Sequence, residues 1–284
     1  MGNGQIQYGI DATDGGFRLD WEPTKNIKRL LKTQVDITRQ KRCPYYHDSE
    51  VIEGQTSFWE KRISKMIHST FEERCIISCG MLHPELTYLK ETGWLNPRQI
   101  LFTPPGLHAL PERLEEYLLN RLRHARELCS DNEIIVVYGK KCHVSTDKPL
   151  KRVDSILQKA GQGIIRVQGD YGYDMLASFE DRQGISGERQ EKILWFTPGW
   201  LKSWKTIYQR YLGWDAADAN ANFPGYYDKI IVLDTIDLSE EYMTQHAEEI
   251  LELFDWTGLE VEFHSITLDR FKGLLKDALS TPVR

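Results

Sequence analysis

Short runs of strand-forming residues alternate with helical patterns from about residue 74 onward, and this alternation constrains the fold more than any other feature of the chain. The apolar strand runs are bounded by Gly or Pro, which is typical of a parallel sheet with crossover helices. The strand runs cover residues 74–78, 99–103, 133–138, 163–167, 193–197, 229–234 and 259–264. The helical patterns lie near residues 84–91, 111–129, 149–160, 171–182, 200–212, 239–254 and 267–279.

Two of the strand runs, Ile134–Val137 and Ile230–Leu233, are apolar without a break. Strands that are covered on both faces have this pattern, whereas half-exposed strands alternate. We therefore predict an α/β domain over residues 71–284, with a Rossmann-like, doubly wound, mostly parallel sheet and flanking helices. The stretch 215–227 has no strong period and is expected to be a long loop over a site.

Residues 1–70 form a separate region by pattern. Residues 1–25 are rich in Gly and Asp and predict an irregular arm. Helical spacing of apolar residues follows over 26–41 and 57–73, with a loop at Pro44 between them. We expect an N-terminal arm and helices that extend the α/β domain, cap its site or make a contact in an assembly.

Composition excludes several classes of function. The net charge is −6 and no long basic run occurs, so nucleic acid is not an expected partner. No stretch reaches the length of about 18 apolar residues that a membrane span needs. The start, Met1–Gly4, lacks the pattern of a signal peptide. The five cysteines do not suggest a disulfide framework. A cytoplasmic location is expected.

Cysteine and histidine side chains follow three of the predicted strands. Carboxyl ends of neighbouring parallel strands lie about 4.8 Å apart, so groups placed there can converge. Sulfur and imidazole donors suit zinc or another transition metal. The candidate ligands are Cys79, His108, Cys142 and His143. Against a metal, the chain has no Cys-x-x-Cys pair, and plain packing explains buried thiols well. Packing is also the expected role of Cys75 and Cys129.

A catalytic interpretation uses the same edge of the sheet. Cys79 precedes a predicted helix, and a helix N-terminus can lower the pKa of a thiol and make it nucleophilic. His108 or His143 would then serve as the base. The metal and the nucleophile remain alternative hypotheses for this edge.

The remaining strand-end residues suggest a binding pocket for a small molecule. Trp200 follows a Pro-Gly turn and can form an aromatic wall or pack in the core. The glycine-rich fingerprints of NAD, FAD and ATP sites are missing at the expected positions. The candidate ligand-binding residues are Gly80, Gly139, Asp170, Tyr171, Thr197, Gly199 and Trp200.

These loops together resemble, in order, the motifs of the family known as domain of unknown function 1638, over about residues 74–260. The resemblance implies a Rossmann-like fold found in anaerobic bacteria and methanogenic archaea, often encoded beside corrinoid-dependent methyltransferases. The motifs are Cys79-Gly80-Met81-Leu82 with Glu85-Leu86, Leu107-His108 with Pro111-Glu112, Tyr138-Gly139 followed by Cys142, and Thr197-Pro198-Gly199-Trp200.

The chain departs from that family pattern at two places. An extra lysine precedes Cys142, and Tyr171 follows Asp170 where the family has a cysteine. The resemblance implies an enzyme or accessory protein of one-carbon, corrinoid-linked methyl-group metabolism, with a methyltransferase or corrinoid protein as partner. The alternative is a non-catalytic protein that binds a small molecule or cofactor in an aromatic pocket. A structural role in an assembly, through the N-terminal helices, is the third hypothesis.

Overall fold

The computed structural model describes residues 71–129, 134–144 and 147–280. The predicted arm and helices of residues 1–70, which include Cys43, lie outside the described residues. So does the predicted start of one strand at residue 133.

Four parallel strands form the first sheet, in the order β2-β1-β3-β4. The two central strands are buried along their whole length, as expected for strands covered on both faces. The strands are β1 (Cys75–Cys79), β2 (Gln99–Thr103), β3 (Ile134–Val137) and β4 (Ile164–Arg166).

The other three strands form a second parallel sheet, in the order β5-β6-β7. They are β5 (Ile193–Phe196), β6 (Lys229–Asp234) and β7 (Glu260–Ser265). The predicted α/β class and the parallel pairing are therefore confirmed. The sequence pattern did not show that the strands divide between two sheets, because pairing partners are chosen in three dimensions.

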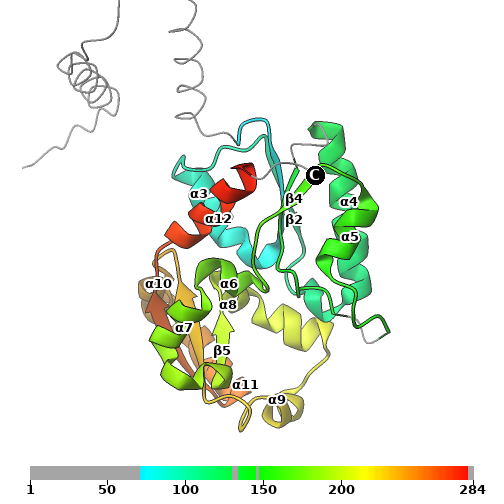
Figure 1. Ribbon diagram of the computed structural model, residues 1–284. Coiled ribbons are helices and arrows are strands. Elements are labelled where there is room, and N and C mark those ends of the chain that lie inside the picture. The colour runs from blue at the N-terminus through cyan, green and yellow to red at the C-terminus, as the bar shows by residue number, and fades with distance from the viewer. Residues whose placement is uncertain (1–70, 130–133, 145–146, 281–284) are drawn as a thin grey trace, which may run out of the picture. The chain divides into compact units, whose positions relative to one another are not determined.

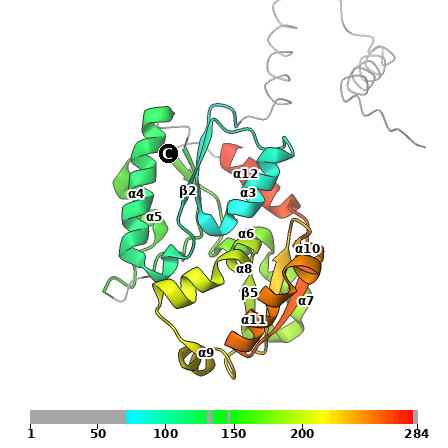
Figure 2. The ribbon, with the colours of Figure 1, turned by 180° about the vertical axis from the view of Figure 1, so that it is seen from behind.

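Helices cover both sheets, and the C-terminal helix returns to the first one. In α4 (Pro111–Leu128) the buried residues recur at helical spacing along one side. Helix α12 (Asp269–Ser280) lies beside α3 (His83–Glu91) in both ribbon views (Figures 1 and 2). Its residues Phe271 and Leu275 share a buried cluster with Ile76 of β1 and with Ile231 of β6. Each of the two buried clusters of the described residues therefore contains residues of both sheets.

Two predicted helices are each divided in two. Residues 171–182 form α6 (Gly172–Leu176) and α7 (Phe179–Ser186), because Ser178 and Asp181 make a capping box that starts a new helix. Residues 239–254 lie in α10 (Leu238–Gln245) and α11 (Ala247–Thr257). The remaining crossover helix of the first sheet is α5 (Val153–Ala160), and the expected loop at 215–227 contains α9 (Ala216–Asn222).

The segment after β5 joins the two sheets. Helix α8 (Pro198–Lys205) continues as a π-helical segment, η5 (Thr206–Tyr211). Helix α8 packs against the 3₁₀ turn η1 (Gly80–Leu82), which follows β1. The Thr197 hydroxyl donates to the Met81 carbonyl at 3.2 Å and accepts from the Trp200 N–H at 3.3 Å. The start of α8, yellow-green in Figure 1, is thus fixed at the carboxyl edge of the first sheet.

Cys75 and Cys129 form a disulfide between the start of β1 and the end of α4, with their Cα atoms 6.3 Å apart. The prediction that these two cysteines serve only in packing was wrong. They are separated by 54 positions in sequence, so only the packing of α4 on β1 brings them together. Cys79 and Cys142 carry free thiols.

The helices that the structure describes include none with both the length and the apolar character of a membrane span.

Candidate functional site

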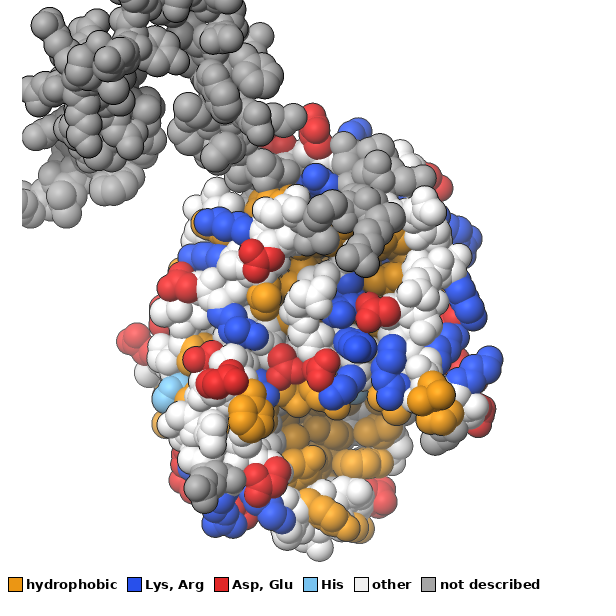
Figure 3. Space-filling view, in the orientation of Figure 1, with side chains coloured by type: hydrophobic (Ala, Val, Ile, Leu, Met, Phe, Trp, Pro, Cys, Tyr) orange, Lys and Arg blue, Asp and Glu red, His pale blue; other side chains and the backbone are white. Residues whose placement is uncertain are grey.

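A cavity of about 310 Å³ lies where β1, β3 and β4 end and α8 begins. Its walls combine thiols, aromatic rings and aliphatic side chains. On the face shown in Figure 3 the surface is hollowed, and hydrophobic side chains line the hollow below a band of charged ones. The described residues that line the cavity are Cys79, Met81, Leu82, His108, Val137, Tyr138, Gly139, Lys141, Cys142, Val144, Tyr171, Gly172, Tyr173, Thr197 and Trp200.

Three glycines make the close packing around the cavity possible. A Cβ atom at Gly80 would lie 2.6 Å from the Thr103 carbonyl oxygen. At Gly139 it would lie 2.5 Å from the Asp170 carbonyl oxygen, and at Gly199 only 2.0 Å from that of Met81. All three glycines were predicted to bind ligand. Of the three, Gly139 lines the cavity, whereas Gly80 and Gly199 lie outside the lining and let neighbouring backbones approach.

Both free thiols line the same cavity. Burial raises the pKa of the Cys79 thiol to about 11, although hydrogen bonds from the Met81 backbone and from Tyr138 act in the opposite direction. Burial raises the pKa of Cys142 to about 12, and the neighbouring Cys79 adds to the rise. Both groups are therefore neutral thiols at pH 7.

His108 lies in the 3₁₀ turn η2 (Leu107–Ala109) after β2. Its ring centroid is 5.0 Å from that of Trp200. Burial lowers the pKa of His108 to about 4, so the imidazole is neutral at pH 7. His108, predicted as a metal ligand or a catalytic base, thus lines the cavity as an uncharged ring packed on an aromatic one.

The aromatic wall comes from both sheets. Trp200, on the first turn of α8, stacks on Phe196 of β5 with centroids 5.4 Å apart. Across the cavity lining, Tyr171 stacks on Tyr173 at 5.3 Å. Trp200 thus lines the cavity and also packs against a buried cluster, which combines the two roles that the sequence left open, and Tyr171 belongs to the same lining.

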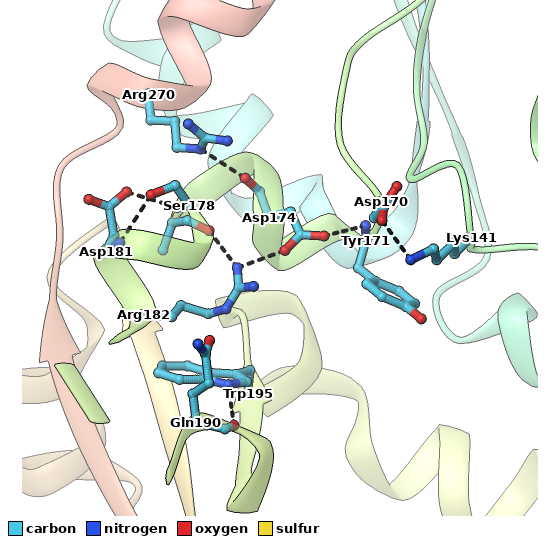
Figure 4. Close-up of polar contacts among 11 residues, drawn as sticks. Lys141, Asp170, Tyr171, Asp174, Ser178, Asp181, Arg182, Gln190, Trp195 and Arg270 are labelled. Atoms are coloured by element: carbon cyan, nitrogen blue, oxygen red, sulfur yellow. Dashed lines mark hydrogen bonds and ion pairs between the residues drawn. The ribbon is translucent and has the colours of Figure 1, made fainter. Parts of the chain in front are cut away.

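Charged groups lie at the rim. The Lys141 ammonium is 2.7 Å from the Asp170 carboxylate, and both side chains are about half exposed. Figure 4 shows this pair beside Asp174, which accepts from the Tyr171 N–H and pairs with Arg182 at 2.7 Å. Asp170 itself does not line the cavity. The structure places Asp170, a predicted ligand-binding residue, as the ion-pair partner of Lys141.

The predicted metal set of Cys79, His108, Cys142 and His143 is not brought together. His143 is buried, its Nδ1 has no hydrogen-bond partner, and it is absent from the cavity lining. Across the described ranges, no group of three or more His, Cys, Asp or Glu side chains could hold a metal ion. A tetrahedral zinc site with this donor set therefore does not fit the observed geometry.

Two functional candidates were not predicted from the sequence. Tyr138 is fully buried, lines the cavity and hydrogen-bonds through its hydroxyl to Thr103. Its position directly after a buried strand was the available signal. Glu85, on α3, is fully buried and its Oε2 has no partner, while Oε1 accepts weakly from Thr235 at 3.5 Å. Burial raises the pKa of Glu85 to about 8.

Comparison with known proteins identifies a family. No curated protein and no solved structure matches significantly. The model of the family described as "Protein of unknown function (DUF1638)" matches residues 102–275. This range contains the motifs around His108, Cys142 and Trp200, whereas the motif at Cys79 precedes it. Since the match covers more than half of the chain, the protein belongs to the DUF1638 family.

Proposed function

We propose that this protein binds a small, uncharged molecule with a flat apolar body in the cavity between η1, β3 and α8. The observation that carries the proposal is the neutrality of the interior. Four titratable groups that line it, Cys79, Cys142, Tyr138 and His108, are uncharged at pH 7, and burial shifts the pKa of each further toward its neutral form. An unpaired ligand charge would lose its hydration there without compensation.

The size and the walls of the cavity support this class of ligand. Small-molecule sites typically have volumes of about 300–1,000 Å³ and mostly apolar walls with a few polar groups. The cavity has about 310 Å³, which suits one or two fused rings. Aromatic faces at Trp200 and Tyr171 favour a flat partner. Of the described lining residues only Lys141 carries a full charge, and it is paired with Asp170 at the rim.

Membership in the family supports a biological setting for this binding. The sequence resemblance implies methyl-group metabolism near corrinoid-dependent methyltransferases, so we propose an enzyme or accessory protein of that metabolism in the cytoplasm. Nucleophilic catalysis by Cys79 with His108 as base is the less favoured form of this proposal. A thiol with a pKa near 11 supplies little thiolate at pH 7.

A charge series on one ring tests the proposal. Benzyl alcohol, benzoate and benzylammonium share a phenyl group and differ in charge. We expect benzyl alcohol to bind and the two ions to bind at least about tenfold more weakly, a difference of about 1.4 kcal/mol. Isothermal titration and quenching of tryptophan fluorescence measure the affinities.

Two tryptophan variants locate the binding. Trp200→Ala should weaken benzyl alcohol binding by about tenfold, since it removes one wall. Trp94→Ala is the matched control, because Trp94 packs against Phe71 and below Lys272. Preferential binding of either ion, or equal losses in the two variants, would contradict the proposal.

A further inference from the structure

A second cavity, of about 400 Å³, adjoins the first one. Trp200 and Tyr173 line both cavities, so the two spaces meet at these aromatic rings. The proposed function uses only the first cavity, which has room for one or two fused rings. A ligand that carries more than those rings would extend past Trp200 and Tyr173 into the second cavity.

One wall of the second cavity is the outer edge of β5. This strand lies at the end of its sheet, where its partner is β6. All four residues of β5 line the cavity. Because successive side chains of a strand point to opposite faces of the sheet, a cavity lined by all of them runs along the edge of the strand.

The edge of β5 offers backbone groups to this cavity. The Lys192 carbonyl, just before the strand, accepts from the Asp228 N–H at 2.8 Å on the side of β6. Backbone groups of successive strand residues point alternately to the two sides, and an edge strand presents one row of N–H and C=O groups outward. This alternation directs the backbone N–H and C=O of Trp195 to the outer edge.

Arg182 supplies further N–H donors. Its side chain is 8% exposed, and its Nη1 donates to the Asp174 carboxylate at 2.7 Å and to the Ala177 carbonyl at 2.6 Å. Its Cζ lies 4.8 Å from the ring centroid of Tyr173 and 5.8 Å from that of Trp195. Figure 4 shows the guanidinium between Asp174 and Trp195. These bonds use only Nη1, so the donors on Nε and Nη2 remain for a ligand.

The charge of Arg182 is compensated by Asp174, so the second cavity favours a neutral hydrogen-bonding group over an anion. A carbonyl oxygen can accept from the guanidinium, and an N–H group can donate to the edge of β5. A secondary amide carries both groups in a fixed geometry, and extended amides pair with sheet edges in many peptide complexes.

We propose that the second cavity binds an uncharged, amide-bearing arm of the ligand whose flat ring occupies the first cavity. The ligand class is an aromatic ring joined by a short chain to a secondary amide. The amide C=O accepts from Arg182, and the amide N–H donates to the outward carbonyl of Trp195. This inference rests on the proposed function for the position of the ring and adds the chemistry of the arm.

A series of N-acetyl phenylalkylamines, with one to four methylene groups between ring and amide, tests the arm. The acetate ester of the same length has oxygen in place of the N–H, and benzyl alcohol has no amide. We expect the best amide of the series to bind at least about tenfold more tightly than benzyl alcohol and about tenfold more tightly than its ester. Isothermal titration of the full chain measures all the affinities.

Two variants locate the arm. Arg182→Lys keeps a positive charge beside Asp174 but removes the planar set of donors, so the amide should lose most of its advantage. Phe179→Ala removes part of the wall of the second cavity at a side chain that is 56% exposed, and should weaken the amide a few-fold. Neither variant should change the affinity for benzyl alcohol. Arg189→Lys is the matched control, because Arg189 pairs with Asp228 outside this lining.

An amide series that binds no more tightly than benzyl alcohol would overturn the inference. So would an amide advantage that is kept in both Arg182→Lys and Phe179→Ala, with thermal melting to confirm that they fold. An equal loss in Arg189→Lys and Arg182→Lys would also contradict it. In these three cases benzyl alcohol still binds, so the proposed function stands. If neither benzyl alcohol nor any amide binds, both proposals fail.

Discussion

The carboxyl ends of the two sheets both contain buried side chains that can form hydrogen bonds, but the two ends use them differently. At the end of the first sheet, Cys79 and Tyr138 face a cavity. At the end of the second sheet, Asp234 is 1% exposed. Its carboxylate accepts from the N–H groups of Leu238 at 2.8 Å and Ser239 at 2.9 Å. The first edge is open to a ligand, and the second is filled by its own chain.

The segment that follows each strand explains the difference. After β6 a helix begins within four residues, and its free N–H groups are satisfied by Asp234. After β3 the chain turns at Gly139, and the next helix among the described residues begins at Val153. The segment that directly follows β3 therefore does not fill the edge with a helix start of its own, and the thiols border a cavity. A polar residue at a strand end is therefore a site candidate only when its own chain leaves it unsatisfied.

Gly199 lies in α8, at the point where the segment after β5 packs on the turn after β1. Its replacement should have the largest effect on the free energy of unfolding. Gly199→Ala would place a Cβ 2.0 Å from the Met81 carbonyl oxygen, and both backbones would have to move. We expect a loss of about 3 kcal/mol in the free energy of unfolding, with loss of benzyl alcohol binding. Urea unfolding measures the first effect and titration the second.

Gly184→Ala is the control for that comparison. No atom lies within 4 Å of a Cβ built at Gly184 in α7, so alanine should stabilise the helix by up to about 1 kcal/mol. If Gly199→Ala had the same free energy of unfolding as Gly184→Ala, the close contact between Gly199 and the Met81 backbone would be refuted.

Glu85 should make the free energy of unfolding depend on pH. It lies on α3, is fully buried, and has Thr235, which follows β6 of the second sheet, as a hydrogen-bond partner. Its pKa of about 8 in the folded protein lies above the usual 4.5. The folded state therefore holds the proton more tightly than the unfolded state. The contribution of protonated Glu85 to the free energy of unfolding is therefore complete below about pH 4.5. It decreases as the pH rises toward about 8, by at most about 1.4 kcal/mol per pH unit.

Glu85→Gln should remove this pH dependence, since glutamine resembles the neutral acid. Between pH 5 and pH 7 the wild-type protein should lose about 2 kcal/mol relative to the variant. Thr235 and Lys202 act against the raised pKa and are present in both proteins. Glu91→Gln, at an exposed position of the same helix, should keep the wild-type profile. If the free energy of unfolding changed with pH in the same way for the wild type and for Glu85→Gln, the raised pKa of Glu85 would be ruled out.

Asp234→Ala tests whether the carboxyl end of the second sheet serves only the stability of the fold. Its effect on the free energy of unfolding should be smaller than that of the changes above. Removing a buried cap with two strong N–H bonds should cost about 2 kcal/mol of unfolding free energy. The control, Asp215→Ala, removes the exposed cap of α9 and should cost about 1 kcal/mol or less. Neither variant should change the benzyl alcohol affinity. Weaker ligand binding in folded Asp234→Ala would show that the two ends are functionally coupled.

The sequence alone predicted the strands and the edge where the site lies. Apolar runs and helical spacing are local, and all seven predicted strands appear within one or two residues of their expected bounds. Because parallel strands end at a common edge, Cys79 and Cys142 could be expected at one edge of the sheet. The sequence could not give the strand order, which decides which loops meet, and Trp200 follows a strand of the other sheet. Periodicity could not show the division of a helix by a capping box as at Ser178, since the pattern of apolar residues continues through it.

Tertiary structure decided which of those strand-end residues share a cavity. Cys142 and His143 are neighbours in sequence, yet only Cys142 reaches the cavity lining, because adjacent side chains of a turn point in different directions. The Cys75–Cys129 disulfide likewise depends on the packing of α4 on β1. Local patterns are set by each segment's own residues, whereas side-chain directions and long-range contacts are set by how the segments pack.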